Sequence, residues 1–156
     1  MYQAPARSKG RKQERYERVQ GFTLVEILIV VVILGILAGI VIPQFNIAAS
    51  ESRDSATSVT VYRIRQQIQI YRQQHSSEWP SFAAFEAQMA GVTDVYGNAA
   101  AAGTPGSFGP YIERLPLNPK TGTKVVGTGA VGSSDWYYDE SNGSFHANDS
   151  AESFAY

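Results

Sequence analysis

The pattern of apolar and polar residues divides the chain into a polar start, one long apolar run and a mixed remainder. Between Phe22 and Ile42, only Thr23 and Glu26 are polar. As an α-helix with a rise of about 1.5 Å per residue, this run spans roughly 31 Å, which matches the hydrocarbon thickness of a bilayer. The pattern therefore predicts a membrane-spanning helix over residues 22–43.

The helical pattern continues beyond this run but changes character. Pro43 lacks a backbone N–H, so it predicts a kink or a loosened turn where the helix leaves the bilayer. Over residues 44–78, apolar residues recur three and four positions apart, which indicates an amphipathic helix with one narrow stripe packed on a core. The stripe consists of Val61, Ile64, Ile68 and Tyr71. We predict a single helix of about 50 residues that includes both parts.

The remaining residues, 79–156, are predicted to form a globular domain that begins with a helix break. Trp79-Pro80-Ser81 ends the long helix, and Ser81 is the expected N-cap of a short helix over Phe82–Ala90 that stops at Gly91. The side chains expected on its buried face are Phe82, Phe85 and Met89.

The C-terminal part is predicted to contain a small sheet. Glycine and proline predict a loop over residues 94–109, and short strands are expected at Thr123–Val126, Ser134–Asp139 and Ser144–Asn148. Asn142-Gly143, between the last two strands, strongly favours a hairpin turn. The expected fold class is α+β, with a long N-terminal membrane-spanning helix packed on a small C-terminal antiparallel β-sheet.

Charge is distributed unevenly along the chain. Residues 1–21 contain six basic and two acidic side chains, a net charge of +4, whereas residues 22–156 contain seven basic and twelve acidic ones, a net charge of −5. A basic flank before a membrane helix stays in the cytoplasm, so we expect a single-pass protein of the cytoplasmic membrane with its acidic domain outside. The domain has no basic patch that would favour nucleic acid, and no cysteine for a disulfide.

A specific motif lies at the junction between the basic start and the apolar run. Gly21 is followed directly by Phe22, and Glu26 lies four residues beyond the phenylalanine. From Gly21 to about Phe45, including Pro43, the sequence resembles the type IV prepilins and the type II secretion pseudopilins. The missing cysteines favour the major pseudopilins. The resemblance implies a structural subunit of a type II secretion pseudopilus, with a surface pilus for adhesion, motility or DNA uptake as the alternative.

The resemblance also implies a processing reaction and an assembly mechanism. A prepilin peptidase would remove residues 1–21 by cleaving after Gly21, and Phe22 would then be N-methylated. Glu26 would pair with the N-terminal ammonium of a neighbouring subunit, because two charges that are each costly in lipid become tolerable when paired. The alternative is that Glu26 only stabilises the start of its own helix, where a carboxylate interacts favourably with the helix dipole.

The partners implied by the resemblance are those of a filament. The chain would form a homo-oligomer through its N-terminal helix, together with minor pilins, first in the bacterial cytoplasmic membrane and then in a periplasmic or surface filament. The chain has no phosphate-binding glycine loop and would not power its own assembly. The resemblance alone implies a membrane assembly platform and a cytoplasmic ATPase. No catalysis is expected, because neither HExxH nor G-x-S-x-G occurs.

Two other hypotheses follow from the residues. Small side chains at Ala48, Ala49 and Ser50 are compatible with an ordinary signal peptidase, which would make the apolar run a removed signal. A membrane-anchored binding module would instead use an aromatic hairpin to capture a ligand. The aromatic residues in question are Trp136, Tyr137, Tyr138 and Phe145.

Calcium is the one cofactor that the sequence suggests, beside the expectation of no cofactor at all. The resemblance implies it, since major pseudopilins often hold a calcium ion in a C-terminal loop. Asp135 and Asp139 are the candidate ligands, with Glu140 and Asp149 nearby. Calcium requires six to eight oxygen ligands, and a solvated acidic hairpin is the favoured alternative.

Overall fold

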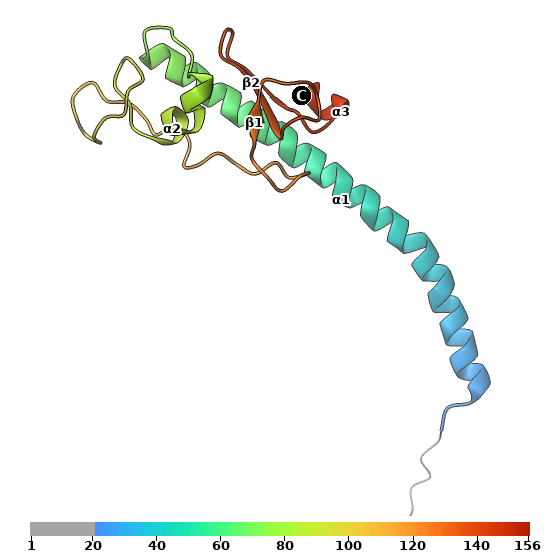
Figure 1. Cartoon of the computed structure of the whole chain (residues 1–156). Helices are drawn as coiled ribbons and strands as arrows, with labels where there is room; N and C mark the ends of the chain where they lie inside the picture. Colours follow the sequence, from blue (N-terminus) through green and yellow to red (C-terminus); the bar gives the residue numbers. More distant parts are fainter. Residues whose placement is uncertain (1–20) are drawn as a thin grey trace, which may run out of the picture. The chain divides into compact units, whose positions relative to one another are not determined.

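The structure is a computed structural model that describes residues 21–156. The predicted leader lies outside the described residues except for Gly21. The described residues form two units, which meet between Ile42 and Pro43. The elements in order (Figure 1) are the helix α1 (Leu24–Gln74), the 3₁₀ helix η1 (Phe82–Ala84), α2 (Phe85–Ala90), β1 (Val126–Gly127), β2 (Trp136–Asp139), β3 (Ser144–Ala147) and α3 (Ala151–Phe154).

The first unit contains the apolar half of α1. This helix passes through Pro43 without interruption and has 51 residues, so the prediction of one continuous helix is confirmed. Every described side chain up to Ile42 is exposed. An 18-residue window has a mean hydropathy of 3.2 with none of its residues buried, so the helix is long and apolar enough to cross a membrane. The predicted kink at Pro43 stays a prediction.

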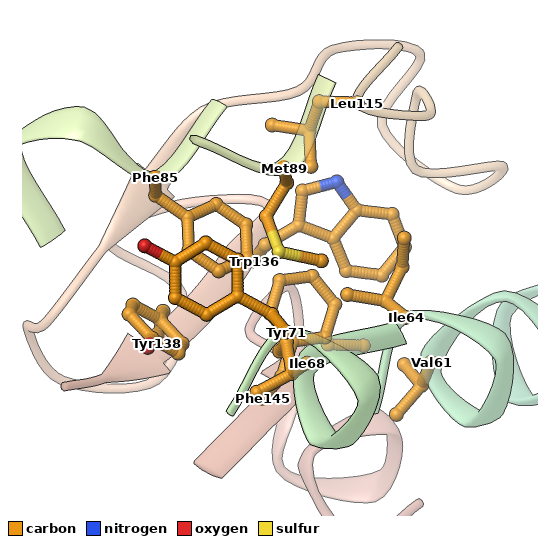
Figure 2. Close-up of a cluster of buried hydrophobic side chains, with 11 residues drawn as sticks. Val61, Ile64, Ile68, Tyr71, Phe85, Met89, Leu115, Trp136, Tyr138 and Phe145 are labelled. Carbon is orange, nitrogen blue, oxygen red and sulfur yellow. The ribbon is translucent and has the colours of Figure 1, made fainter. Parts of the chain in front are cut away.

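The second unit is built around the amphipathic half of α1. The four predicted stripe residues are all buried, at most 3% exposed, and Thr57 extends the stripe by one turn. They pack against side chains from α2, from the sheet and from the connecting segment (Figure 2). These partners are Phe85, Met89, Leu115, Trp136, Tyr138, Phe145 and Ala147. The α+β fold class is therefore confirmed, with a long helix packed on a small sheet.

The sheet differs from the prediction in the direction of its first strand. β2 and β3 pair antiparallel, but β1 pairs parallel to β2, so the three-stranded sheet is mixed. β1 also shares only Val126 with the predicted strand. The reason is that the Asp135 carboxylate accepts hydrogen bonds from the Thr123 hydroxyl (2.7 Å) and the Val125 N–H (2.6 Å), so this N–H binds a side chain and not a neighbouring strand.

The short helix also begins differently. Residues Phe82–Ala84 form a 3₁₀ turn, and the Ser81 side chain caps neither η1 nor α2. The Phe82 N–H is instead satisfied by the Glu140 carboxylate (2.6 Å) from the hairpin. Phe82 itself is 38% exposed, so only Phe85 and Met89 of the predicted buried face reach the core. Sequence pattern alone does not reveal a partner 58 residues away.

A buried histidine anchors the end of α1 to the loop that follows. The helix ends at Gln74, and Ser76 and Ser77 then adopt positive φ angles of 53° and 71°. The His75 ring stacks on Tyr71 (3.7 Å between centroids), with its Nδ1 2.8 Å from the Tyr71 carbonyl oxygen and its Nε2 2.9 Å from the Thr93 hydroxyl. Thr93 pairs with Phe108 across the predicted loop, so isolated bridges shape this segment.

The predicted hairpin turn is confirmed at the tip of β2 and β3. Asp139 pairs with Ser144, and Gly143 has a φ of +72° and donates its N–H to the Asp139 carbonyl (2.9 Å). A Cβ at this glycine would lie 2.4 Å from the Trp79 ring. The ring in turn lies 4.3 Å below the Arg72 guanidinium. The glycine thus serves both the turn and the close packing of Trp79.

Gly143→Ala tests this double constraint. We expect a loss of roughly 2–4 kcal/mol in the free energy of unfolding, from the left-handed backbone and from the clash with Trp79. Gly122→Ala is the matched control, since Gly122 also has a positive φ (+76°) but nothing lies within 4 Å of its Cβ position. It should lose only about 1–2 kcal/mol. Equal losses, measured by thermal unfolding, would contradict a role for Trp79.

Candidate functional site

The first three described residues form a short non-helical segment before α1. Gly21, Phe22 and Thr23 are exposed, and the helix begins only at Leu24. The peptide bond between Gly21 and Phe22 therefore lies outside the helix. A bond in this position is open to an enzyme, because a protease needs extended backbone that is free of helical hydrogen bonds.

Thr23 and Glu26 form a capping box at the start of α1. The Thr23 hydroxyl oxygen accepts a hydrogen bond from the Glu26 N–H (3.2 Å), while a Glu26 carboxylate oxygen accepts from both the N–H and the hydroxyl of Thr23 (3.1 Å each). Two backbone N–H groups that have no partner within the helix are thereby satisfied reciprocally. This carboxylate also lies at the positive end of the helix dipole.

This geometry gives Glu26 a partner within its own chain. The alternative that we considered for Glu26, the stabilisation of its own helix start, therefore describes the observed contact. Pairing with a neighbouring subunit stays a prediction. Sequence reasoning did not use Thr23, although the pattern Thr-x-x-Glu before an apolar run is the signature of a capping box.

The two predicted calcium ligands lie at opposite ends of β2, and each is hydrogen-bonded by its own loop. Burial would raise the pKa of the Asp135 carboxyl, but hydrogen bonds from Thr121, Thr123 and Val125 outweigh burial, so its pKa lies below its ordinary value. Asp139 accepts hydrogen bonds from the side chain and backbone of Ser141, which lower its pKa. Within residues 21–156, no three His, Cys, Asp or Glu side chains are close enough to share a metal ion. Calcium binding stays a prediction.

Three of the four aromatic rings of the hairpin belong to the core, and the fourth, Tyr137, is half-buried. Trp136, Tyr138 and Phe145 are each 0% exposed. The Tyr138 hydroxyl donates to the Pro80 carbonyl (2.6 Å), and burial, with Glu140 as a smaller cause, raises its pKa above the ordinary range. The binding-module hypothesis required these rings to be accessible, so the burial of three of them does not favour it.

Two cationic side chains fasten the C-terminal residues to α1. The Lys120 ammonium pairs with Asp54 of α1 and donates to the Ser153 hydroxyl (2.6 Å) of α3, with Asp149 at 3.8 Å. The ammonium bonded to it lowers the pKa of Asp54. The second cation, Arg65, donates to the Phe145 carbonyl (2.7 Å).

Arg65 also contacts His146, which stacks on Phe154 of α3 (4.7 Å between ring centroids). One Arg65 nitrogen lies 2.8 Å from Nδ1 of His146 and also contacts the Tyr156 carbonyl. Burial, reinforced by the Arg65 guanidinium, lowers the pKa of His146 below its ordinary value of 6.5. The fold therefore favours the neutral imidazole.

The lowered pKa predicts how stability depends on pH. The unfolded chain binds a proton at His146 more readily than the folded chain does. The free energy of unfolding should therefore fall as the pH drops below 6.5. Above pH 6.5, His146 is neutral in both states and should not affect the free energy of unfolding. Arg65, Tyr137 and Tyr156 are the charged or titratable groups that face this ring. We expect His146→Gln to weaken the decline in thermal stability between about pH 6.5 and 5. An unchanged profile would contradict the assignment.

Comparisons with known proteins agree with this geometry. Residues 18–42 match the family described as the prokaryotic N-terminal methylation motif. The chain is 30% identical over 105 residues to the type II secretion system core protein G of Aeromonas hydrophila. The matched region covers 65% of this chain and 68% of that protein. It is also 30% identical over 109 residues to the protein of the same name from Vibrio cholerae serotype O1, which covers 68% of each chain. No solved structure gives a significant match.

Proposed function

The chain belongs to the family of the type II secretion system core protein G, and on this premise we propose how it is processed and assembled. It is a structural subunit of a pseudopilus. The proposal is that a prepilin peptidase cleaves after Gly21, that Phe22 is N-methylated, and that Glu26 guides the assembly of the filament. One observation carries it: the matched motif coincides with an exposed bond directly before a capped apolar helix.

The capped helix start supports cleavage at this position. Because the capping box fixes the start of α1 at Leu24, the Gly21–Phe22 bond stays outside the helix whatever the length of the helix beyond. Cleavage would leave the Thr23 N–H in place, since Thr23 follows the new terminus. The cap therefore survives in the mature subunit.

Assembly would exchange one partner of Glu26 for another. In the single chain, the Glu26 carboxylate accepts hydrogen bonds from Thr23, which are contacts between exposed groups. In lipid, an unpaired charge costs about 2.5–3.5 kcal/mol near a helix centre and less near its end. A neighbour's ammonium would neutralise the carboxylate, so the filament would be favoured over the separated subunit.

The apolar half of α1 supplies the surface for this association. None of the residues in its most apolar window is buried within the chain. Before assembly we propose that lipid covers this surface, with the basic leader in the cytoplasm and residues 44–156 outside. In the filament, neighbouring copies of α1 would cover it.

The other proposed partners follow from this pathway. A membrane assembly platform and a cytoplasmic ATPase would supply the force for extraction from the membrane, and minor pilins would start or cap the filament. The matched relatives favour a secretion pseudopilus over a surface pilus. A structural role without catalysis is proposed for the mature chain.

The N-terminus of the protein from cell envelopes tests the pathway. Mass spectrometry of the N-terminal peptide should show N-methylphenylalanine at position 22. A start at Met1 would contradict processing, and a start next to Ser50 would indicate an ordinary signal peptide. A Gly21→Leu variant should keep the leader, since a larger side chain blocks close approach to the scissile bond.

A further inference from the structure

The triplet Asn-x-Ser occurs twice in the chain, at Asn142-Gly143-Ser144 and at Asn148-Asp149-Ser150. When the middle residue is not proline, this triplet is the acceptor for N-linked glycans in exported proteins, provided that it lies on the surface. The two asparagines lie six positions apart in sequence, yet Asn142 is exposed and Asn148 is buried.

Asn148 is closed to modification. Its side chain is 0% exposed, and its amide nitrogen donates hydrogen bonds to the Ser134 hydroxyl (2.8 Å) and the Ala130 carbonyl (3.2 Å). A glycan on this nitrogen would remove a donor and could not be accommodated in the packed interior. Asn148 therefore has a structural role.

Asn142 is exposed at the tip of the β2–β3 hairpin. Its side-chain oxygen accepts a hydrogen bond from the Ser144 N–H (2.8 Å), so the asparagine and the serine of the triplet are held next to each other. Its amide nitrogen donates a hydrogen bond to the Asp139 carboxylate (3.0 Å), which fixes the orientation of the side chain. An acidic residue, Glu140, precedes the asparagine by two positions.

The surface beside Asn142 is suited to a sugar. Asn142 and Ser144 lie at the edge of an open depression of about 410 Å³. Polar side chains of α1 and β3 complete its wall, namely Arg65, Gln69 and His146. Amides and a guanidinium are the groups that hydrogen-bond to sugar hydroxyls, and the depression can hold the first sugar of a chain.

We propose that Asn142 is an N-glycosylation site. The glycan donor is a polyprenyl-diphosphate-linked oligosaccharide, and an oligosaccharyltransferase is the enzyme. The amide nitrogen of Asn142 forms a bond to C1 of the first sugar while the bond from C1 to the diphosphate oxygen breaks. The lipid diphosphate leaves with the electron pair, and the proton that the amide loses passes to solvent water. The proposal rests on the extracytoplasmic orientation given under Proposed function, since such transfer occurs on exported domains.

Mass spectrometry of the full chain from the envelopes of its own cells tests the proposal. The last basic residue is Lys124, so trypsin leaves both triplets on one peptide, whereas chymotrypsin separates them by cutting after Phe145. We expect a glycan mass on the Asn142 peptide and none on the Asn148 peptide. An unmodified or merely deamidated Asn142 peptide would overturn the proposal. The N-terminal peptide of the same digest reports processing at Phe22 separately, so failure of one does not imply failure of the other.

Variants of Ser144 keep the test independent of folding. Among residues 21–156, the Ser144 side chain has no hydrogen-bond partner, so Ser144→Ala removes the hydroxyl that the transferase recognises and leaves the turn intact. It should abolish the glycan mass, whereas Ser144→Thr should retain it. A glycan that persists in Ser144→Ala would show that attachment does not follow the triplet and would overturn the proposal.

Discussion

Glu26→Gln should abolish filament assembly while processing at Gly21 continues. Glutamine preserves the capping box, since its side-chain oxygen can still accept from the Thr23 N–H, as Glu26 does at 3.1 Å. The substitution removes only the charge that we propose to pair with a neighbour's ammonium. We expect at least about a tenfold loss of pelletable filament, the equivalent of roughly 1.4 kcal/mol per subunit contact.

Variants of Thr23 show whether assembly requires the charge of Glu26 or the capping box that Glu26 forms with Thr23. Thr23→Val removes the hydroxyl that accepts from the Glu26 N–H and should cost about 1 kcal/mol of helix stability. Thr23→Ser keeps the hydroxyl and should behave as the unsubstituted chain. Filament yield and N-terminal mass are measured for each variant. If Glu26→Gln assembles normally and Thr23→Val fails, the cap and not the charge is what assembly requires.

The parts of the fold that depend on local pattern could be predicted from the sequence. The stripe from Val61 to Tyr71 follows from helical periodicity, because every fourth residue on average faces the core. The hairpin follows from Asn142-Gly143, because a positive φ is least costly at glycine. The continuous helix of 51 residues follows from an uninterrupted pattern on both sides of Pro43.

The features that were missed depend on side chains far apart in sequence. The carboxylate of Asp135 fixes Thr123 and Val125, which shifted β1 toward the C-terminus. Glu140 satisfies the first N–H of η1, and the side-chain cap expected from Ser81 is not formed. No local propensity distinguishes a carboxylate that binds backbone from one that binds calcium, because the same carboxylate oxygens serve both roles.

In the functional site, too, the sequence predicts the local motif but not the contacts that its side chains make. Gly21, Phe22 and Glu26 could be identified from a short motif, since they lie within six consecutive residues. The contact that Glu26 makes in the single chain required the structure, because the carboxylate has two possible partners. One is Thr23, three residues away. The other would belong to a second copy, and a single sequence gives no measure of their relative strength.

The largest loss of stability is expected from Trp136→Ala. The indole is 0% exposed, lies 5.4 Å from the Phe145 ring between centroids, and donates its N–H to the Pro116 carbonyl (3.0 Å). Removing a buried tryptophan costs about 3–5 kcal/mol, and the Pro116 carbonyl loses its partner as well. Since the whole domain is stable by only about 5–15 kcal/mol, a large part of its stability would be lost.

Hydrogen–deuterium exchange of the β3 amides in the detergent-solubilised chain measures this loss, because these amides open only when the sheet does. Trp136→Phe should cost less than Trp136→Ala, since a ring remains against Phe145 although the hydrogen bond to Pro116 is gone. The control is Tyr96→Ala, at a side chain that is 83% exposed, which should change stability by at most about 0.5 kcal/mol. A tolerated Trp136→Ala would contradict the prediction that the sheet depends on this indole.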